Sequence, residues 1–240
     1  MIRKILRLCA DAIFPPRCVA CGIHLGNTKG GVLCDKCRKS ILIHTAFFCA
    51  RCKKRRPEGK KTCHPGEKFL VAAAGSYDNR ALRELIHAWK YNNVRAASKE
   101  IRKIIEAYIN EAAHLFTEDL YSIVPTPLYP GKERKRGFNQ AREIAGALLE
   151  SLSARGVAAE VVEPLTRVRN TKTQTDMKNF LERGENIEGS FRIESPIAVF
   201  RKNIVLVDDV FTSGATMREA ARVLKSAGAR HILGFVLALA

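Results

Sequence analysis

The spacing of the cysteines gives the clearest indication of chemistry in this chain. Seven of the eight cysteines fall between positions 18 and 63. The pairs at Cys18 and Cys21 and at Cys34 and Cys37 each enclose two residues and are separated by twelve. Two Cys-x-x-Cys turns at this spacing place four thiolates around one tetrahedral Zn²⁺. A disulfide framework is the alternative, but no export signal precedes the pairs and the cytosol keeps thiols reduced. The sequence therefore predicts a zinc ribbon.

A second group of candidate ligands follows in "CARC" (49–52) and "CH" (63–64). Cys49, Cys52, Cys63 and His64 would make a Cys₃His zinc site, which is chemically sound although its spacing departs from two Cys-x-x-Cys pairs. Whether this second site holds zinc stays open at this point. Cys9 lies apart from both groups, and we expect it to be a buried apolar side chain of an N-terminal helix.

A different chemistry is indicated by "IVLVDDVFTSGAT" (204–216). The apolar run predicts a buried strand with Asp208 and Asp209 at its carboxyl end, followed by a helix. Backbone N–H groups at a helix start favour a phosphate, and Gly214 is expected to leave room for its approach. The carboxylates would repel that phosphate, so we expect them to bind hydroxyl groups or a metal ion at the other end of the same ligand. A phosphorylated sugar meets both requirements. The expected phosphate-binding residues are Thr212, Ser213, Gly214, Ala215 and Thr216.

The charge of the chain also favours an anionic partner. The 240 residues include 41 Lys plus Arg and 24 Asp plus Glu, which give a formal net charge of +17. Much of the excess lies in segments 51–61 and 132–136. Nucleic acid, phosphorylated metabolites or an anionic surface would suit this charge, whereas the alternative is a basic surface that only keeps the protein soluble. No apolar stretch reaches the ~18–20 residues that cross a bilayer, so no membrane insertion is expected.

These residues need a fold that positions them, and the pattern predicts an α/β domain. Strands that alternate with helices form a mostly parallel sheet covered on both faces. A charged stretch with Gly and Pro at 53–68 marks the boundary of this domain. We expect an N-terminal helix and zinc-ribbon module over 1–67 and the α/β domain over 68–240. The expected strands are 69–77, 121–125, 158–163, 203–209 and 231–239, and a core-facing helix is expected at 138–152.

The stretch "VLVDDVFTSGAT" resembles the 5-phosphoribosyl-1-pyrophosphate (PRPP) loop of type I phosphoribosyltransferases, and nearly the whole chain resembles ComF-type proteins. The resemblance implies a type I phosphoribosyltransferase fold, a Rossmann-like parallel sheet, joined to a zinc ribbon. It further implies PRPP as a ligand, bound together with Mg²⁺. The segments that carry it are "FPPRCVACG" (14–22), "SYDNRALRELIHAWKYNN" (76–93), "VPTPLYPGKERKRGFNQAREIA" (124–145) and "LTRVRNTKTQT" (165–175).

The resemblance also suggests where pyrophosphate would lie. Arg136 and Arg169 are expected to contact it, because guanidinium groups chelate phosphate oxygens. The stretch 165–175 would close over it, and Asn139 and Gln140 would brace the neighbouring loop. His87 is expected to be structural. The implied reaction is displacement at ribose C1, but no acceptor and no catalytic residue can be assigned.

Two classes of function stay open. In the first, the chain is a phosphoribosyltransferase, a pentosyl-class glycosyltransferase with an unknown acceptor. In the second, it is a cytoplasmic factor for single-stranded DNA uptake in natural competence, as ComF proteins are, with DNA and a competence helicase or DNA-processing protein as partners. A catalytically inactive zinc-ribbon adaptor that binds DNA is the alternative to both. The diacid loop favours ligand binding, and the basic segments favour nucleic acid.

Overall fold

A computed structural model describes residues 16–26, 31–56, 63–64, 66–67, 69–91, 95–169 and 187–240. The expected N-terminal helix with Cys9, residues 57–61 of the basic segment and residues 170–175 of the closing stretch lie outside the described residues. Within the described part of the chain, no helix combines the length and the apolar character that crossing a membrane requires.

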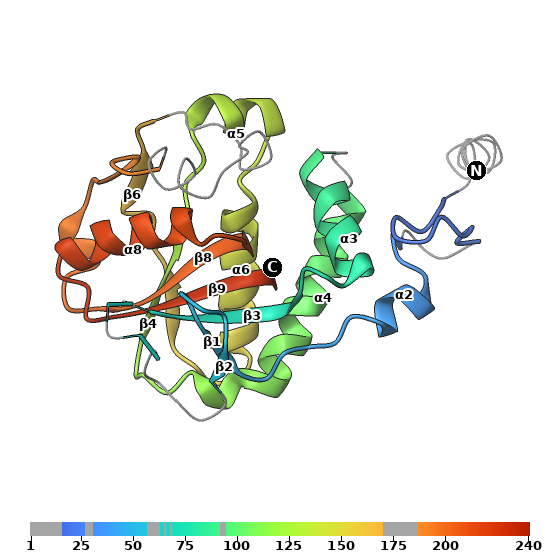
Figure 1. Ribbon diagram of the computed structural model, residues 1–240, viewed down its shortest axis with the longest axis horizontal. Helices are drawn as coiled ribbons and strands as arrows, with labels where there is room; N and C mark the ends of the chain where they lie inside the picture. Colours follow the sequence, from blue (N-terminus) through green and yellow to red (C-terminus); the bar gives the residue numbers. More distant parts are fainter. Residues whose placement is uncertain are drawn as a thin grey trace.

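A central sheet organises the described residues (Figure 1). Seven strands follow the order β2-β1-β3-β9-β8-β4-β5. The five from β3 to β5 are mutually parallel, while β1 and β2 join the edge in antiparallel pairs. A two-stranded antiparallel ribbon, β6 with β7, stands apart. The strands are β1 (Phe47–Cys49), β2 (Arg55–Arg56), β3 (Leu70–Ser76), β4 (Tyr121–Pro125), β5 (Ala159–Val161), β6 (Leu165–Arg167), β7 (Phe191–Ile193), β8 (Asn203–Phe211) and β9 (His231–Leu239).

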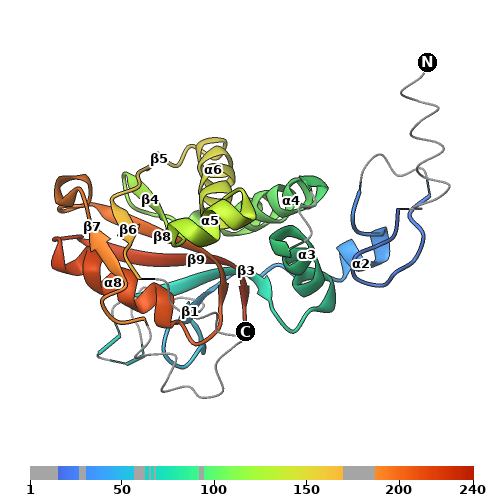
Figure 2. The same ribbon diagram turned by 90° about the horizontal axis from the view of Figure 1, so that it is seen from above.

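Helices cover both faces of the sheet (Figure 2). Helices α3, α4 and α6 lie over one face, and α8 with the β6–β7 ribbon lies over the other. The strands serve both layers by alternation: in β8, Val205 and Val207 join the first core, while Ile204 and Leu206 join the second. The helices are α2 (Asp35–Lys39), α3 (Arg80–Tyr91), α4 (Arg95–Ala112), α5 (Pro130–Arg136), α6 (Gln140–Ser153) and α8 (Ala215–Ser226), with 3₁₀ turns η1 (Ala113–Leu115) and η3 (Pro196–Ala198).

The expected α/β architecture is confirmed, with one difference at the functional edge. Strand β8 continues to Phe211, so Asp208 and Asp209 lie within the strand, and Asp208 is in register with Val236 of β9. The carboxyl ends of the parallel strands meet at this edge, where ligands bind in open α/β sheets.

The second cysteine group is part of the sheet itself. Strand β1 ends at Cys49 and pairs along its length with β3. The sheet therefore contains strands from both sides of the expected domain boundary between 67 and 68. That this boundary separates two units that fold independently stays a prediction.

The first cysteine group is attached to the layer of helices α3, α4 and α6 through a partly buried ion pair. Arg38 in α2 donates to both carboxylate oxygens of Glu100 in α4, at 2.9 and 3.2 Å. The Glu100 side chain is only 5% exposed. Burial alone would raise the pKa of Glu100, but the hydrogen bonds and charge of Arg38 outweigh it and lower that pKa. The carboxylate is therefore ionised and ties α2 to α4.

We expect Glu100→Gln to lower the free energy of unfolding at pH 7 by about 2 kcal/mol, because Arg38 loses its buried counter-charge and keeps only the exposed one of Asp35. The depressed pKa means that this stabilisation is present above the unfolded pKa of about 4.3 and is lost as the pH falls through the lower folded value. Urea denaturation at pH 7 and below pH 4 checks both points. Glu106→Gln, at an exposed position of the same helix, is the control. An equal effect of the two substitutions would contradict the role of the ion pair.

Candidate functional site

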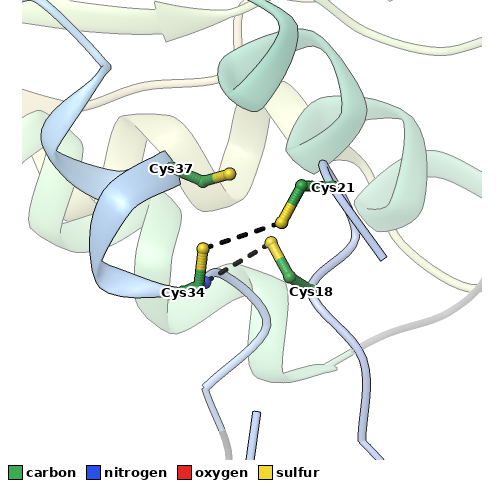
Figure 3. Close-up of side chains that lie close together, drawn as sticks. All are labelled: Cys18, Cys21, Cys34 and Cys37. Carbon is green, nitrogen blue, oxygen red and sulfur yellow. Dashed lines mark hydrogen bonds between the residues drawn. The ribbon is translucent and has the colours of Figure 1, made fainter. Parts of the chain in front are cut away.

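The first cysteine cluster has the geometry of a metal site (Figure 3). The sulfur atoms of Cys18, Cys21, Cys34 and Cys37 all lie within 4.8 Å of one another. The Sγ atoms of Cys21 and Cys34 are 3.7 Å apart, and a tetrahedron with Zn–S bonds of about 2.3 Å has edges of about 3.8 Å. The backbone N–H of Cys34 points at the sulfur of Cys18, at 3.4 Å. These residues fit the zinc that their spacing predicts.

The second cluster brings together the other four predicted ligands. Cys49, Cys52, Cys63 and His64 also place their ligand atoms within 4.8 Å of one another. The Sγ atoms of Cys52 and Cys63 are 3.2 Å apart, and Nδ1 of His64 lies 3.5 Å from the sulfur of Cys49. The irregular spacing in sequence is therefore compatible with a compact Cys₃His set.

The protonation of the thiols shows that each cluster suits a divalent cation. Burial opposes ionisation of Cys18 and Cys49, but hydrogen bonds from surrounding groups outweigh it and lower the pKa of each to about 6. Burial and the neighbouring thiols raise the pKa of Cys37 to about 12, and hydrogen bonds with Cys52 are the main cause that raises the pKa of Cys63 to about 11. In each cluster one thiol is thus favoured as a thiolate and another keeps its proton, and a bound divalent cation would favour the ionised form of both.

A separate cavity of about 230 Å³ lies at the carboxyl edge of the sheet. Helix α3, the turn after β4, α5, the start of α6 and the loop after β8 contribute its walls. The predicted site residues that line it are Arg136, Asp208, Asp209, Thr212, Gly214 and Thr216. Ser213 and Ala215 belong to the same loop, whereas Arg169 is not among the lining residues: its Nη1 donates to the carbonyl oxygen of Glu188 at 3.2 Å.

The carboxylate pair is the electrostatic centre of this cavity. The ammonium group of Lys90, from α3, lies 2.8 Å from Oδ2 of Asp209, and both side chains are less than one-fifth exposed. Burial, followed by the charge of Asp209, raises the pKa of Asp208 to about 7, although the Asp209 backbone N–H, Lys90 and Arg167 oppose the rise. A proton is therefore favoured on Asp208 up to near-neutral pH, and the place suits hydroxyl donors or a cation.

The loop after β8 is shaped by Gly214. This residue has φ +76° and precedes α8. A Cβ built there would lie 2.3 Å from the Phe211 ring, so the side chain is excluded from the protein side of the loop. The sequence led us to expect that glycine leaves room for the phosphate, but the space it leaves is occupied by Phe211. Its role is to let the loop fold over that ring.

The opposite wall carries polar atoms that lack partners. The side chain of Asn139 braces this wall, because Nδ2 donates to the carbonyl oxygen of Thr126 and Oδ1 accepts from the N–H of Ala141. Oγ1 of Thr126 and Nε2 of Gln140 are buried and have no hydrogen-bond partner among the described residues. Buried polar groups are rarely left unsatisfied, so this wall is suited to a polar ligand.

Sequence reasoning missed several cavity residues. His87, expected to be structural, is exposed and lies on the cavity wall one turn from Lys90. Arg167 lines the cavity from the last position of β6, whereas Arg169 lies two residues beyond the strand. No pattern in α3 indicated that its polar side faces the diacid. The missed lining residues that carry chemistry are Tyr77, His87, Lys90, Lys132 and Arg167.

We expect Asp208→Asn to stabilise the protein increasingly as the pH rises from about 4 to about 7. A raised folded pKa means that Asp208 contributes stability below its unfolded pKa and loses it as the pH rises through about 7. Because the substituted side chain does not titrate, we expect the free energy of unfolding of the variant at pH 8 to exceed that of the wild type by about 2 kcal/mol, after allowance for the partial exposure of Asp208. Thermal melting at several pH values measures the difference. Exposed Asp78→Asn is the control, and a pH-independent difference would refute the assignment.

The comparisons with known proteins agree with both parts of this architecture. Residues 9–65 match the family described as "Double zinc ribbon domain", and residues 140–239 match "Phosphoribosyl transferase domain". The chain is 27% identical to Competence protein F of Haemophilus influenzae over 238 residues, which cover 93% of this chain and 97% of that protein. It is 28% identical to DNA utilization protein YhgH of Escherichia coli K12 over 201 residues, 83% of this chain and 81% of that one. It is 25% identical to Competence protein ComFC of Streptococcus pneumoniae over 244 residues, 92% and 99%.

The order of the two matched families, the two metal-ligand clusters and the nearly full-length similarity lead to one assignment: the chain belongs to the ComF/YhgH family, with a double zinc ribbon followed by a phosphoribosyltransferase domain.

Proposed function

We propose that the chain binds PRPP in the cavity at the carboxyl edge of the sheet and acts in the handling of single-stranded DNA. The observation that carries the ligand assignment is that a diacid and the N-terminal end of helix α8 line the same cavity. Each end of a phosphorylated ribose then meets groups of the right polarity. Asp208 and Asp209 would accept the ribose hydroxyls, and the N–H groups of 212–216 would hold the 5′-phosphate.

The pyrophosphate would lie against the wall formed by the turn after β4 and by α5. Thr126 and Gln140 would donate their unsatisfied groups to it, and Lys132 and Arg136 line the same side of the cavity. When bound, Mg²⁺ would supply neutralisation of the pyrophosphate charge. Phosphoribosyl transfer is the finer activity that we propose, and fixed cations around the departing pyrophosphate would favour it. Contact between Arg169 and the ligand stays a prediction, and it would require the chain beyond β6 to move toward the cavity.

The DNA assignment rests on the basic surface. Exposed basic residues occur on α5 at Arg134 and Lys135, beside the cavity, and near β2 at Lys54 and Arg55. The names of similar proteins include "DNA utilization protein" and "Competence protein". A polyanionic strand without sequence preference suits such scattered cations. A competence helicase or another DNA-processing protein is the partner that we propose in addition.

Calorimetric titration with PRPP and Mg²⁺ tests the ligand assignment. We expect Asp209→Asn to weaken binding by about tenfold to a hundredfold, because a charged acceptor is lost. Gly214→Ala should weaken binding as strongly, since its Cβ would strike Phe211 and move the loop. Glu106→Gln is the matched surface control. Unchanged affinity in both site variants, with circular dichroism like that of the wild type, would rule the site out, and no binding by the wild type would favour the inactive adaptor.

Salt dependence of binding to a single-stranded oligonucleotide tests the DNA assignment. We expect the simultaneous change of Lys54, Arg55, Arg134 and Lys135 to Ala to flatten the slope of log K against log salt by up to about 3, because each lost phosphate contact removes about 0.7. Affinity for PRPP should stay close to that of the wild type. Lys99→Ala, at an exposed position of α4, controls for loss of charge elsewhere. An identical slope in the fourfold variant would show that DNA binds at another surface or not at all.

A further inference from the structure

One arginine joins the phosphate loop to the second cysteine cluster. Arg218 lies in the first turn of α8, and its side chain is about one-third exposed. Its Nη1 donates to the carbonyl oxygen of Ser213 at 2.6 Å, and its Nη2 donates to the carbonyl oxygen of Ala50 at 2.6 Å. Its Nε donates to the carboxylate of Glu67 at 3.2 Å. A planar guanidinium group thus holds three acceptors from distant parts of the chain.

Both distant acceptors are neighbours of metal ligands. Ala50 is fully buried and follows Cys49 directly in the turn that leads to Cys52. The N–H of Glu67 donates to the carbonyl oxygen of His64 at 3.0 Å, and the Glu67 carboxylate is 7% exposed. Positions of the Ala50 and Glu67 oxygens are therefore set by the backbone that presents the Cys₃His ligands.

The third acceptor lies at the point where the loop is most constrained. Ser213 precedes Gly214, which needs a left-handed backbone above the Phe211 ring. The guanidinium carbon of Arg218 lies 5.9 Å from the centre of that ring. The N–H of Gly214 belongs to the same trans peptide group as the Ser213 carbonyl, so it points away from Arg218 while the arginine holds that carbonyl. If Arg218 moved, this peptide group would rotate, and the loop would bind an anion less tightly.

We propose that Arg218 is a positioning residue that couples zinc in the Cys49–His64 cluster to the affinity of the phosphate loop. Zinc fixes the ligand turn, the turn fixes the arginine, and the arginine fixes Ser213. The coupling must be reciprocal, so a ligand in the loop strengthens retention of zinc in this cluster. The inference rests on the proposed function only for the identity of the ligand, PRPP.

The first cluster provides an internal comparison. It is attached to the opposite layer of the fold, because Arg38 binds Glu100 of α4 and Cys18 packs in the core shared by α3, α4 and α6. Ala50 instead packs with Phe211 and Met217 in the core beneath α8. The two clusters should therefore differ in their effect on the loop.

Amide hydrogen exchange of residues 212–216 tests the coupling without any ligand. We compare the zinc-loaded wild type with Cys52→Ser and Cys21→Ser, in which metal analysis should find one zinc per chain in place of two. Exchange in the loop should rise about tenfold in Cys52→Ser and stay at the wild-type rate in Cys21→Ser. Equal loop exchange in all three proteins, or a wild type without zinc in the second cluster, would overturn the proposal.

PRPP binding supplies the reciprocal test. Arg218→Ala should retain two zinc ions but bind PRPP about tenfold more weakly, and PRPP should no longer slow the removal of zinc by a chelator, as it does in the wild type. Arg222→Ala, one turn further along α8, is the matched control and should keep that protection. Protection of zinc by PRPP that persists in Arg218→Ala would overturn the proposal. A wild type that binds no PRPP defeats the proposed function alone, and the exchange experiment then decides the coupling.

Discussion

Two carboxylates at adjacent positions of one buried strand are the constraint on which the arrangement of this protein depends. Like charges in a poorly solvated place repel each other and favour a proton on one of them, as the pKa of Asp208 indicates. They persist as an anionic pair only where cations come close, and Lys90 of α3 and Arg167 of β6 provide them from opposite layers of the fold. The helices and strands packed on the two faces of the sheet thus supply the positive charges that stabilise the ionised form of the diacid.

The two cysteine clusters support the elements that surround this edge of the sheet. The first stabilises the layer that contains Lys90, because α2 is tied to α4 beside α3. The second continues the sheet through β1 and packs below the loop that follows the diacid. Metal sites and cavity are therefore parts of one folded body, although they lie far apart in sequence.

Features with local signals could be predicted from the sequence. The ligand clusters, strand β8 and the start of α8 depend on spacing and periodicity within short stretches. The contribution of Lys90 could not be predicted, because it depends on how α3 lies across the sheet edge. The obstacle that a side chain at Gly214 would meet depends on where the Phe211 ring lies, and the pairing of β1 with β3 spans a segment of no regular pattern. Such tertiary relations have no counterpart in the local pattern of residues.

The two ends of the sheet have a consequence for solubility. Open strands invite pairing with other chains, and proteins limit this with very short or charged edges. The strand at one end, β2, comprises Arg55 and Arg56 within the described part of the chain, and the strand at the other, β5, has three residues with Glu160 bound to Lys202. A sheet bounded in this way discourages strand addition, so the molecule can expose a strongly basic surface to long polyanions without stacking into aggregates along its own edges.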